Sequence, residues 1–291
     1  MIPAEILRKV RRIQIVTAAL VQDFFAGQYH SAFKGRGMEF EEVREYQPGD
    51  DIRTIDWNVT ARTGRPFIKH FREERELTVL LVVDVSPSQD FGTRAQLKSE
   101  LVAELGATLA FSAIQNNDKV GLLLFTDRVE RFVPPRKGPR HGLRVVRELL
   151  YHLPTGRGTD IAAALDYLNR IQRRRAVVFL VSDFQAPPFD AALQVARHRH
   201  DLIPVIVEDP RERELPPVRF VELYDPETGG QVLVDTGSRA LRRRYAALAA
   251  ERRARLRAAL GRLRLDAIEI ATGEPFVAPL KAFFRRREQR R

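Results

Sequence analysis

Between residues 77 and 207, short apolar runs alternate with longer segments whose apolar residues recur every three or four positions. Short continuous apolar runs suit strands buried on both faces, and the wider spacing is typical of amphipathic helices. The expected strands are 77–84, 119–125, 129–133, 176–182 and 202–207, and the expected helices are 94–116, 142–152, 160–173 and 189–200. This β-α-β-α order predicts an α/β fold with a doubly wound, mostly parallel sheet.

Further segments flank this region, so we expect three parts. Residues 1–75 are expected to hold an N-terminal helix over 3–26 and a small β-rich extension. Residues 76–238 would form the α/β domain with an inserted hairpin, whose turn is the Asp-Pro-Glu-Thr-Gly-Gly stretch at 225–230. Residues 239–291 would form a basic C-terminal extension of helix, strand and helix.

The first part is rich in opposite charges. Three aspartates could be read as a catalytic carboxylate cluster, but three arginines lie close to them in the sequence. These residues are Asp50, Asp51, Asp56, Arg44, Arg53 and Arg62. We interpret them as a structural network of ion pairs and turns, and we expect Trp57, the only tryptophan, to anchor a core.

Composition excludes several classes of protein. The 291 residues contain no cysteine, which excludes disulfides, zinc–thiolate sites and cysteine nucleophiles. No apolar run approaches the roughly 20 residues that span a bilayer, and the N-terminus lacks a clear signal peptide. We therefore expect a cytoplasmic protein without a membrane span.

The net charge of +11 is concentrated at the C-terminus. Residues 239–291 contain 15 Arg and 1 Lys against 5 acidic residues, whereas residues 1–238 balance at 33 basic and 33 acidic. The basic segment is interpreted mainly as a solvated helix face. An acidic partner surface, and nucleic acid or anionic lipid, remain alternatives.

Small oxygen-bearing side chains follow the apolar runs. Asp84, Ser86 and Ser88 come directly after the run that ends at Val83, Thr159 precedes an expected helix, and Asp183 follows another run. Each residue alone could be a helix cap or part of a turn. Together they suit a divalent cation at the carboxyl edge of the sheet, because such ions prefer oxygen ligands.

In this order, Asp84, Ser86, Ser88, Thr159 and Asp183 resemble the metal-ion-dependent adhesion site of von Willebrand factor A domains. The resemblance implies that the three hydroxyls bind Mg²⁺ or Mn²⁺ and that the two aspartates act directly or through waters. It also implies an open position for the carboxylate of a partner protein. The Ser-Asp-Phe sequence at 182–184 departs from the usual Thr-Asp-Gly, and Pro87 and Gln89 replace the usual Gly and Met.

A second resemblance covers residues 35–69, with Val-Arg-Glu-Tyr, Pro-Gly-Asp-Asp-x-Arg and Ile-Asp-Trp elements. These elements look like the signature of a bacterial family of uncharacterised proteins with an A-domain-like core, commonly encoded beside MoxR-type AAA+ ATPases. The resemblance implies an accessory role, in which a metal-dependent adaptor helps the ATPase in protein maturation or remodelling.

The sequence therefore predicts a protein-binding adaptor and not an enzyme. One alternative is a metal-assisted hydrolase, for which Asp90 or Asp160 is the best candidate general base. No Gly-x-Ser-x-Gly elbow or Walker lysine supports a hydrolase or an ATPase. The other alternative is a nucleic-acid or membrane-surface binder acting through residues 239–291, although nucleic acid is an unlikely partner for a chain whose basic charge is so local.

Overall fold

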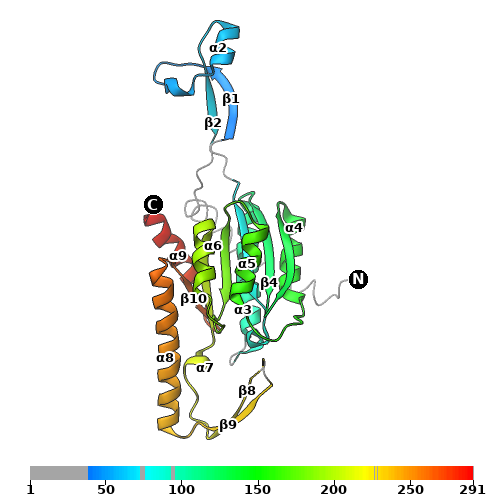
Figure 1. The fold of residues 1–291 in the computed structure, drawn as a ribbon, viewed down its shortest axis with the longest axis vertical. Coiled ribbons are helices and arrows are strands. Elements are labelled where there is room, and N and C mark those ends of the chain that lie inside the picture. Colours follow the sequence, from blue (N-terminus) through cyan, green and yellow to red (C-terminus); the bar gives the residue numbers. More distant parts are fainter. Residues whose placement is uncertain (1–38, 73–75, 93–95, 226, 228, 291) are drawn as a thin grey trace. The chain divides into compact units, whose positions relative to one another are not determined.

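The structure is a computed structural model that describes residues 39–72, 76–92, 96–225, 227 and 229–290. The helix expected over 3–26 lies outside these residues. The chain divides into two compact units, a smaller one over residues 33–77 and a larger one that contains residues 78–291. Figure 1 labels the elements of both.

The larger unit is built on a six-stranded sheet. Its strands are β3 (Thr78–Asp84), β4 (Lys119–Phe125), β5 (Val129–Arg136), β6 (Val177–Ser182), β7 (Asp201–Glu208) and β10 (Ile268–Ala271). Their spatial order is β10-β7-β6-β3-β4-β5, and all neighbours are parallel except β4 and β5. The order runs outward in both directions from the central strand β3. The predicted doubly wound, mostly parallel sheet is therefore confirmed.

Helices cover both faces of this sheet (Figure 1). They are α3 (Lys98–Gln115), α4 (Pro139–Tyr151), α5 (Ile161–Ile171), α6 (Asp190–Arg199), α8 (Arg239–Arg262) and α9 (Val277–Gln289). On one face, Leu80 and Val82 of β3 share a buried cluster with Leu165 of α5 and Leu193 of α6. Alternate residues of a strand point to opposite faces, so Leu81 packs toward α3. Burial on both faces explains why β3 and β6 are continuous apolar runs.

The C-terminal segment completes this unit. Strand β10 pairs in parallel with β7 and forms one edge of the sheet. Leu260 of α8 joins the buried cluster, and Phe283 and Phe284 of α9 are fully buried. Between β7 and α8 lie the short helix α7 (Pro210–Arg213) and the expected hairpin, formed by β8 (Phe220–Tyr224) and β9 (Gln231–Asp235).

The smaller unit is a two-stranded antiparallel sheet with short helices in its connection. Its elements are β1 (Glu39–Glu45), the 3₁₀ helix η1 (Ile52–Thr54), α2 (Trp57–Thr63) and β2 (Phe67–Arg72). Asp50 pairs with Arg44 through two hydrogen bonds of 2.7 and 2.9 Å, while Asp51 and Asp56 cap η1 and α2. These three aspartates therefore have the structural roles that the sequence indicates.

Trp57 does not anchor a core, so that prediction is wrong. Its side chain is 71% exposed at the first position of α2, directly after the cap residue Asp56. Ile68 is the buried hydrophobic residue among the side chains described in this unit. A two-stranded sheet with two short helices offers little interior for a ring as large as indole.

Candidate metal centre at the carboxyl edge of the sheet

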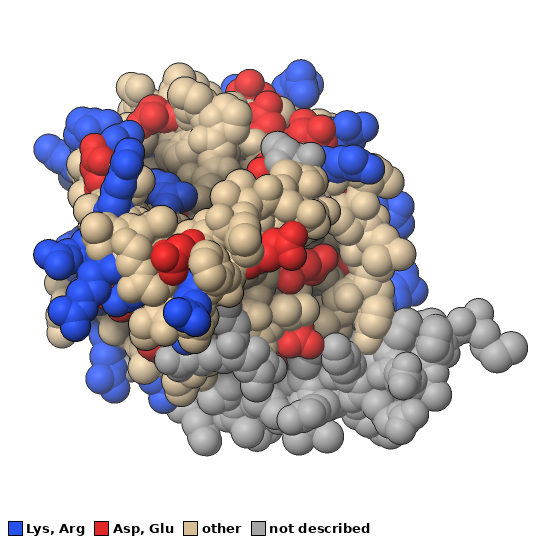
Figure 2. All heavy atoms as spheres, turned by 90° about the horizontal axis from the view of Figure 1, so that it is seen from below, with Lys and Arg blue, Asp and Glu red and all other residues tan. Residues whose placement is uncertain are grey.

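The aspartates of the candidate site lie on neighbouring strands. Asp84 is the last residue of β3, and Asp183 directly follows β6. Because β3 and β6 are parallel neighbours, their carboxyl ends meet at the same edge of the sheet. Figure 2 views the molecule from this end, where Asp and Glu side chains gather near the middle and Lys and Arg side chains lie toward the rim.

Four of the five predicted residues form one hydrogen-bonded network. Asp84, which is 1% exposed, accepts from the backbone N–H of Ser86 at 2.9 Å and from Ser182 Oγ at 2.7 Å. The hydroxyls of Ser86 and Ser88 are 2.9 Å apart, and Ser88 Oγ donates to Asp183 Oδ2 at 3.4 Å. Residues 84, 86, 88 and 183 thus present a continuous set of oxygen atoms.

The fifth residue, Thr159, is linked to a carboxylate that the sequence analysis did not select. Thr159 is 6% exposed, and its Oγ1 donates to Glu227 Oε1 at 3.3 Å. Glu227 lies in the turn of the β8–β9 hairpin, a stretch that the sequence marks only as a turn. Its pKa is raised, first by burial, and repulsion from Asp183 adds to the shift. The hairpin therefore brings a carboxylate to the predicted ligand Thr159.

Lys98 is the second residue that the sequence analysis missed. Its side chain is fully buried at the start of α3, and Nζ donates to Asp183 Oδ2 and to Glu212 Oε1, both at 2.8 Å. Burial opposes the charged form, but the two carboxylates outweigh it and raise the pKa of Lys98. A lysine at a helix N-terminus, where the helix dipole disfavours a cation, was the signal that could have identified it.

The site has more negative than positive charge. Burial raises the pKa of Asp84 to about 6, and repulsion from Asp183 adds to this, against hydrogen bonds from Ser182 and Ser86. Burial also raises the pKa of Glu212, although Lys98 lowers it. The ammonium group of Lys98 contacts two carboxylates, those of Asp183 and Glu212, while the charge of Asp183 also raises the pKa of both Asp84 and Glu227.

This donor set fits a hard divalent cation only if hydroxyls take part. Within the described ranges, no three His, Cys, Asp or Glu side chains gather as a metal-binding group. An ion here would depend on Ser86, Ser88 and Thr159 besides the carboxylates of Asp84 and Asp183. Mg²⁺ commonly accepts one or two carboxylates and completes its shell with other oxygens, so the set is suitable.

The turn after β6 explains one departure from the A-domain pattern. Phe184 stands where such domains usually have glycine, and its φ is 58°, in the left-handed region that glycine favours. The conformation costs a non-glycine residue about 1 kcal/mol. Phe184 is 7% exposed and packs against Phe189, with ring centroids 5.8 Å apart, which offsets this cost. The turn that positions Asp183 is thus retained without the glycine.

The loop that carries Thr159 is held by Glu130 of β5. Glu130 accepts hydrogen bonds from Gly156 N at 2.7 Å, Thr126 Oγ1 at 2.9 Å, and the hydroxyl and backbone N–H of Thr155. Burial alone would raise the pKa of Glu130, but these bonds lower it to about 2.

Replacing Glu130 by Gln is expected to lower the free energy of unfolding by about 2 kcal/mol at pH 7, because charge-assisted hydrogen bonds to the loop are lost. Urea unfolding measures this loss. The depressed pKa means that the contribution is present above about pH 4.5 and disappears as pH falls toward 2. A difference between the two proteins that persists at pH 2 would contradict the assignment.

The carboxylates considered for a hydrolase do not join this network. Asp160 caps α5 and accepts from the backbone N–H of Ala163 at 2.9 Å. Asp90 is an exposed residue of the 3₁₀ helix η2 (Pro87–Asp90). Capping is sufficient to explain Asp160.

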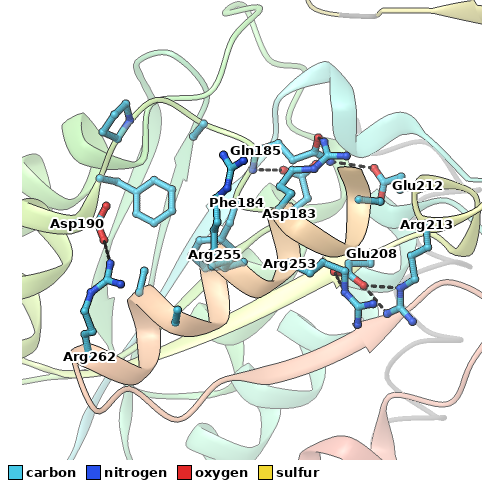
Figure 3. Close-up of a pocket in the computed structure, with 18 residues that line it drawn as sticks. Asp183, Phe184, Gln185, Asp190, Glu208, Glu212, Arg213, Arg253, Arg255 and Arg262 are labelled. Carbon is cyan, nitrogen blue, oxygen red and sulfur yellow. Dashed lines mark hydrogen bonds and ion pairs between the residues drawn. The ribbon is translucent and has the colours of Figure 1, made fainter. Parts of the chain in front are cut away.

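A cleft of about 510 Å³ lies beside Asp183, between α8 and the loop after β6 (Figure 3). Arg253, Arg255 and Arg262 extend from α8 along it, and Phe184 contributes to its apolar lining. Several of these arginines are paired within the chain. Arg253 contacts Glu208 at 3.1 Å, Arg255 contacts Glu251, and Arg262 lies 3.7 Å from Asp190. The basic face of α8 is thus partly an ion-pair surface and not only a solvated one.

Comparison with known proteins identifies relatives without a described function. A family model described as "Protein of unknown function DUF58" matches residues 42–255. The chain is similar to the uncharacterized protein Mb1516 of Mycobacterium bovis, with 35% identity over 223 residues, which cover 76% of this chain and 70% of that protein.

Two solved structures are similar at low identity. One is described as an aerotolerance-related membrane protein from Bacteroides fragilis, with 14% identity and a TM-score of 0.47 over 74% of this chain and 100% of that chain. The other is the SpRpn10 VWA domain, with 13% identity and a TM-score of 0.37 over 70% and 93% of the two chains. At such scores the fold assignment rests on the strand order of this sheet.

The predicted cytoplasmic location is wrong. It rested on the lack of a spanning segment and of a signal peptide, whereas the similar Bacteroides fragilis chain is described as a membrane protein. No helix among the described residues is both long and apolar enough to cross a bilayer. That observation was too weak a basis for assigning a compartment.

Proposed function

Since the chain belongs to the DUF58 family, whose function is unknown, its role has to be argued from its own site, and we propose a metal-dependent protein-binding adaptor. Mg²⁺ or Mn²⁺ would be held by Ser86, Ser88 and Thr159, with Asp84 and Asp183 acting directly or through waters. The ion would supply a coordination position for a carboxylate from a partner protein. The protein would be a binding module and not an enzyme.

The observation that carries this proposal is the buried network of oxygen atoms at the end of β3. Asp84 is almost inaccessible to solvent and lies close enough to Asp183 for the two charges to repel each other. A buried carboxylate is usually neutralised by a cation or by protonation. Lys98 pairs with Asp183 and Glu212, so a divalent ion would supply the charge that Asp84 lacks.

Glu227 supports a site that accepts carboxylates. Its side chain approaches Thr159 from a hairpin that is 68 residues away in the sequence. A carboxylate from a partner could take the same place if the hairpin turn moved aside. Glu227 would then compete with the partner for the ion, and replacing Glu227 by Gln should favour partner binding.

We further propose a MoxR-type AAA+ ATPase as the collaborator, with protein maturation or remodelling as the process. This rests on the resemblance of residues 35–69 and on the arginines of α8, of which Arg255 and Arg262 keep more than two thirds of their side chains exposed. An acidic surface of a ring ATPase would complement them. Binding of the purified ATPase to wild type and to Asp84→Ala, at one fixed Mg²⁺ concentration, tests whether the contact depends on the site.

The metal site is tested by thermal unfolding of wild type and Asp84→Ala in EDTA and across Mg²⁺ and Mn²⁺ titrations. A ligand that binds only the folded state stabilises it by about 2.7 kcal/mol at 100 times its Kd, so the melting temperature of wild type should rise. Asp84→Ala should not respond, while Asp160→Asn, which keeps an N-cap on α5, should respond like wild type. The same response in Asp84→Ala and wild type would refute the site.

A further inference from the structure

A second hollow, of about 430 Å³, lies at the opposite edge of the sheet, where β6, β7 and β10 begin. Five arginines contribute to its lining, namely Arg175, Arg197, Arg264, Arg287 and Arg290. They come from four separate segments: the approaches to β6 and β10 and the C-terminal turns of α6 and α9. The fold therefore gathers charges that are up to 115 positions apart in the sequence.

His200 forms part of the wall of this hollow and is the most informative residue there. It is 2% exposed, and neither ring nitrogen has a hydrogen-bond partner among the described residues. A neutral imidazole always has one N–H donor and one acceptor nitrogen, and leaving both unpaired inside a protein costs free energy. A buried ring of this kind is suited to a polar ligand that enters the hollow.

The charge of the hollow specifies the kind of ligand. Among its described lining residues, two carboxylates accompany the five guanidinium groups: Asp201 pairs with Arg287, and Asp266 pairs with Arg290 at 2.5 Å. The lining keeps three positive charges in excess. Burial lowers the pKa of His200, and the charges of Arg199 and Arg175 lower it further, so the ring stays neutral at pH 7 and can donate one hydrogen bond.

Helix dipoles explain only part of this cluster. Cations are favourable in the last turn of a helix, which accounts for Arg197 in α6 and Arg287 in α9. Arg175 precedes β6, so the dipole gives no reason for it. Arg264 follows the end of α8 with a φ of 48°, at a position where helices usually carry glycine. Arg264 therefore stands at a position where the backbone conformation favours glycine.

From this geometry we infer a binding site for a small phosphate-class oxyanion, such as diphosphate or the phosphate groups of a small metabolite. Guanidinium groups match phosphate oxygens with paired N–H donors, and an excess of three positive charges suits a ligand with two or more negative charges. The volume falls within the range of small-molecule sites, of about 300–1,000 Å³. The site is separate from the candidate metal centre, which lies at the carboxyl edge of the same sheet.

The test is calorimetric titration of the full chain with inorganic pyrophosphate in EDTA at constant ionic strength. EDTA keeps the measurement independent of the metal centre. The double variant Arg175→Gln/Arg264→Gln should bind pyrophosphate at least about tenfold more weakly than wild type. The matched control Arg140→Gln/Arg144→Gln removes the same charge from exposed positions of α4, outside the hollow, and should bind like wild type.

Two further titrations distinguish the possible classes of ligand. Adding ADP asks whether the phosphates of a nucleotide are accepted, and a single-stranded RNA oligomer asks whether a nucleic acid backbone is the better ligand. The imidazole resonances of His200 should shift on pyrophosphate binding in the wild-type protein. No binding at millimolar pyrophosphate, equal loss in both double variants, or tighter binding of RNA than of either small ligand would each overturn the inference.

Discussion

Replacing Lys98 by Met is expected to lower the free energy of unfolding by about 3–5 kcal/mol at pH 7. The side chain of Lys98 is fully buried, and its ammonium group is within 2.8 Å of carboxylate oxygens of both Asp183 and Glu212. Methionine fills a similar volume but leaves the buried carboxylate of Asp183 and the partly buried carboxylate of Glu212 without this cation. Removing one partner of a buried ion pair is far more costly than replacing the whole set.

Urea unfolding followed by far-UV circular dichroism measures this loss. Fluorescence is less suitable, because the only tryptophan lies in the smaller unit. The matched control is the triple variant Lys98→Met/Asp183→Asn/Glu212→Gln, which removes the buried charges together and should recover most of the stability. If the free energy of unfolding of Lys98→Met alone lies within about 1 kcal/mol of the wild-type value, the loss is no larger than that of an exposed ion pair. Lys98 would then not be a buried counterion.

The effect of pH gives a second test of the same residue. The raised pKa of Lys98 means that its stabilising contribution is complete below the ordinary lysine pKa of about 10.4 and is lost as pH rises through the higher folded-state value. In Lys98→Met, Glu212 has lost the ammonium group that lowers its pKa. Protonation of Glu212 on mild acidification then removes one unpaired charge, so the deficit should shrink as pH falls from 8 toward 5.

The strands of the sheet were readable from the sequence because burial on both faces leaves a strong local signal. The predicted strands 77–84 and 176–182 each begin one residue before the observed strands β3 and β6 and end at the same residues. The order of strands has no such signal, since it depends on packing between distant segments. Sequence alone could not show that β10 pairs with β7 and places the C-terminal segment in the same sheet.

The sequence predicts those residues of the candidate site that directly follow strands. Asp84 and Asp183 each end an apolar run, and parallel strands bring such residues to one edge. Lys98 and Glu227 reach the site across 85 and 68 positions, to Asp183 and Thr159 respectively. Glu227 has no local mark, because a glutamate in a turn is common on surfaces, and the only local sign of Lys98 is its place at the N-terminus of α3, where the helix dipole disfavours a cation. The prediction that Trp57 anchors a core was wrong because it rested on residue type alone, without a supporting pattern of apolar neighbours.

If the role of Asp84 is to bind an ion, its buried negative charge should destabilise the folded protein when no metal is bound. The neutral variant Asp84→Asn is therefore expected to be more stable than wild type by roughly 2–3 kcal/mol in EDTA at pH 8, since each pKa unit corresponds to about 1.4 kcal/mol. Asparagine has nearly the same shape and can still accept from the backbone N–H of Ser86. Asp160→Asn, a change of the same kind at an N-cap, should alter stability little.

The sign follows from the pKa of Asp84, which burial and Asp183 raise from 3.8 to about 6 in the folded protein. Below about pH 3 the carboxyl is protonated in both the folded and unfolded states, so wild type and Asp84→Asn should unfold alike. As pH rises through 6, the folded wild-type protein must hold a buried charge, and its stability falls relative to the variant. Saturating Mg²⁺ should then raise the stability of wild type alone and close the gap at pH 8. If Asp84→Asn is no more stable than wild type in EDTA at pH 8, the buried charge carries no cost that a metal ion could relieve, and Asp84 is a structural cap for the turn after β3.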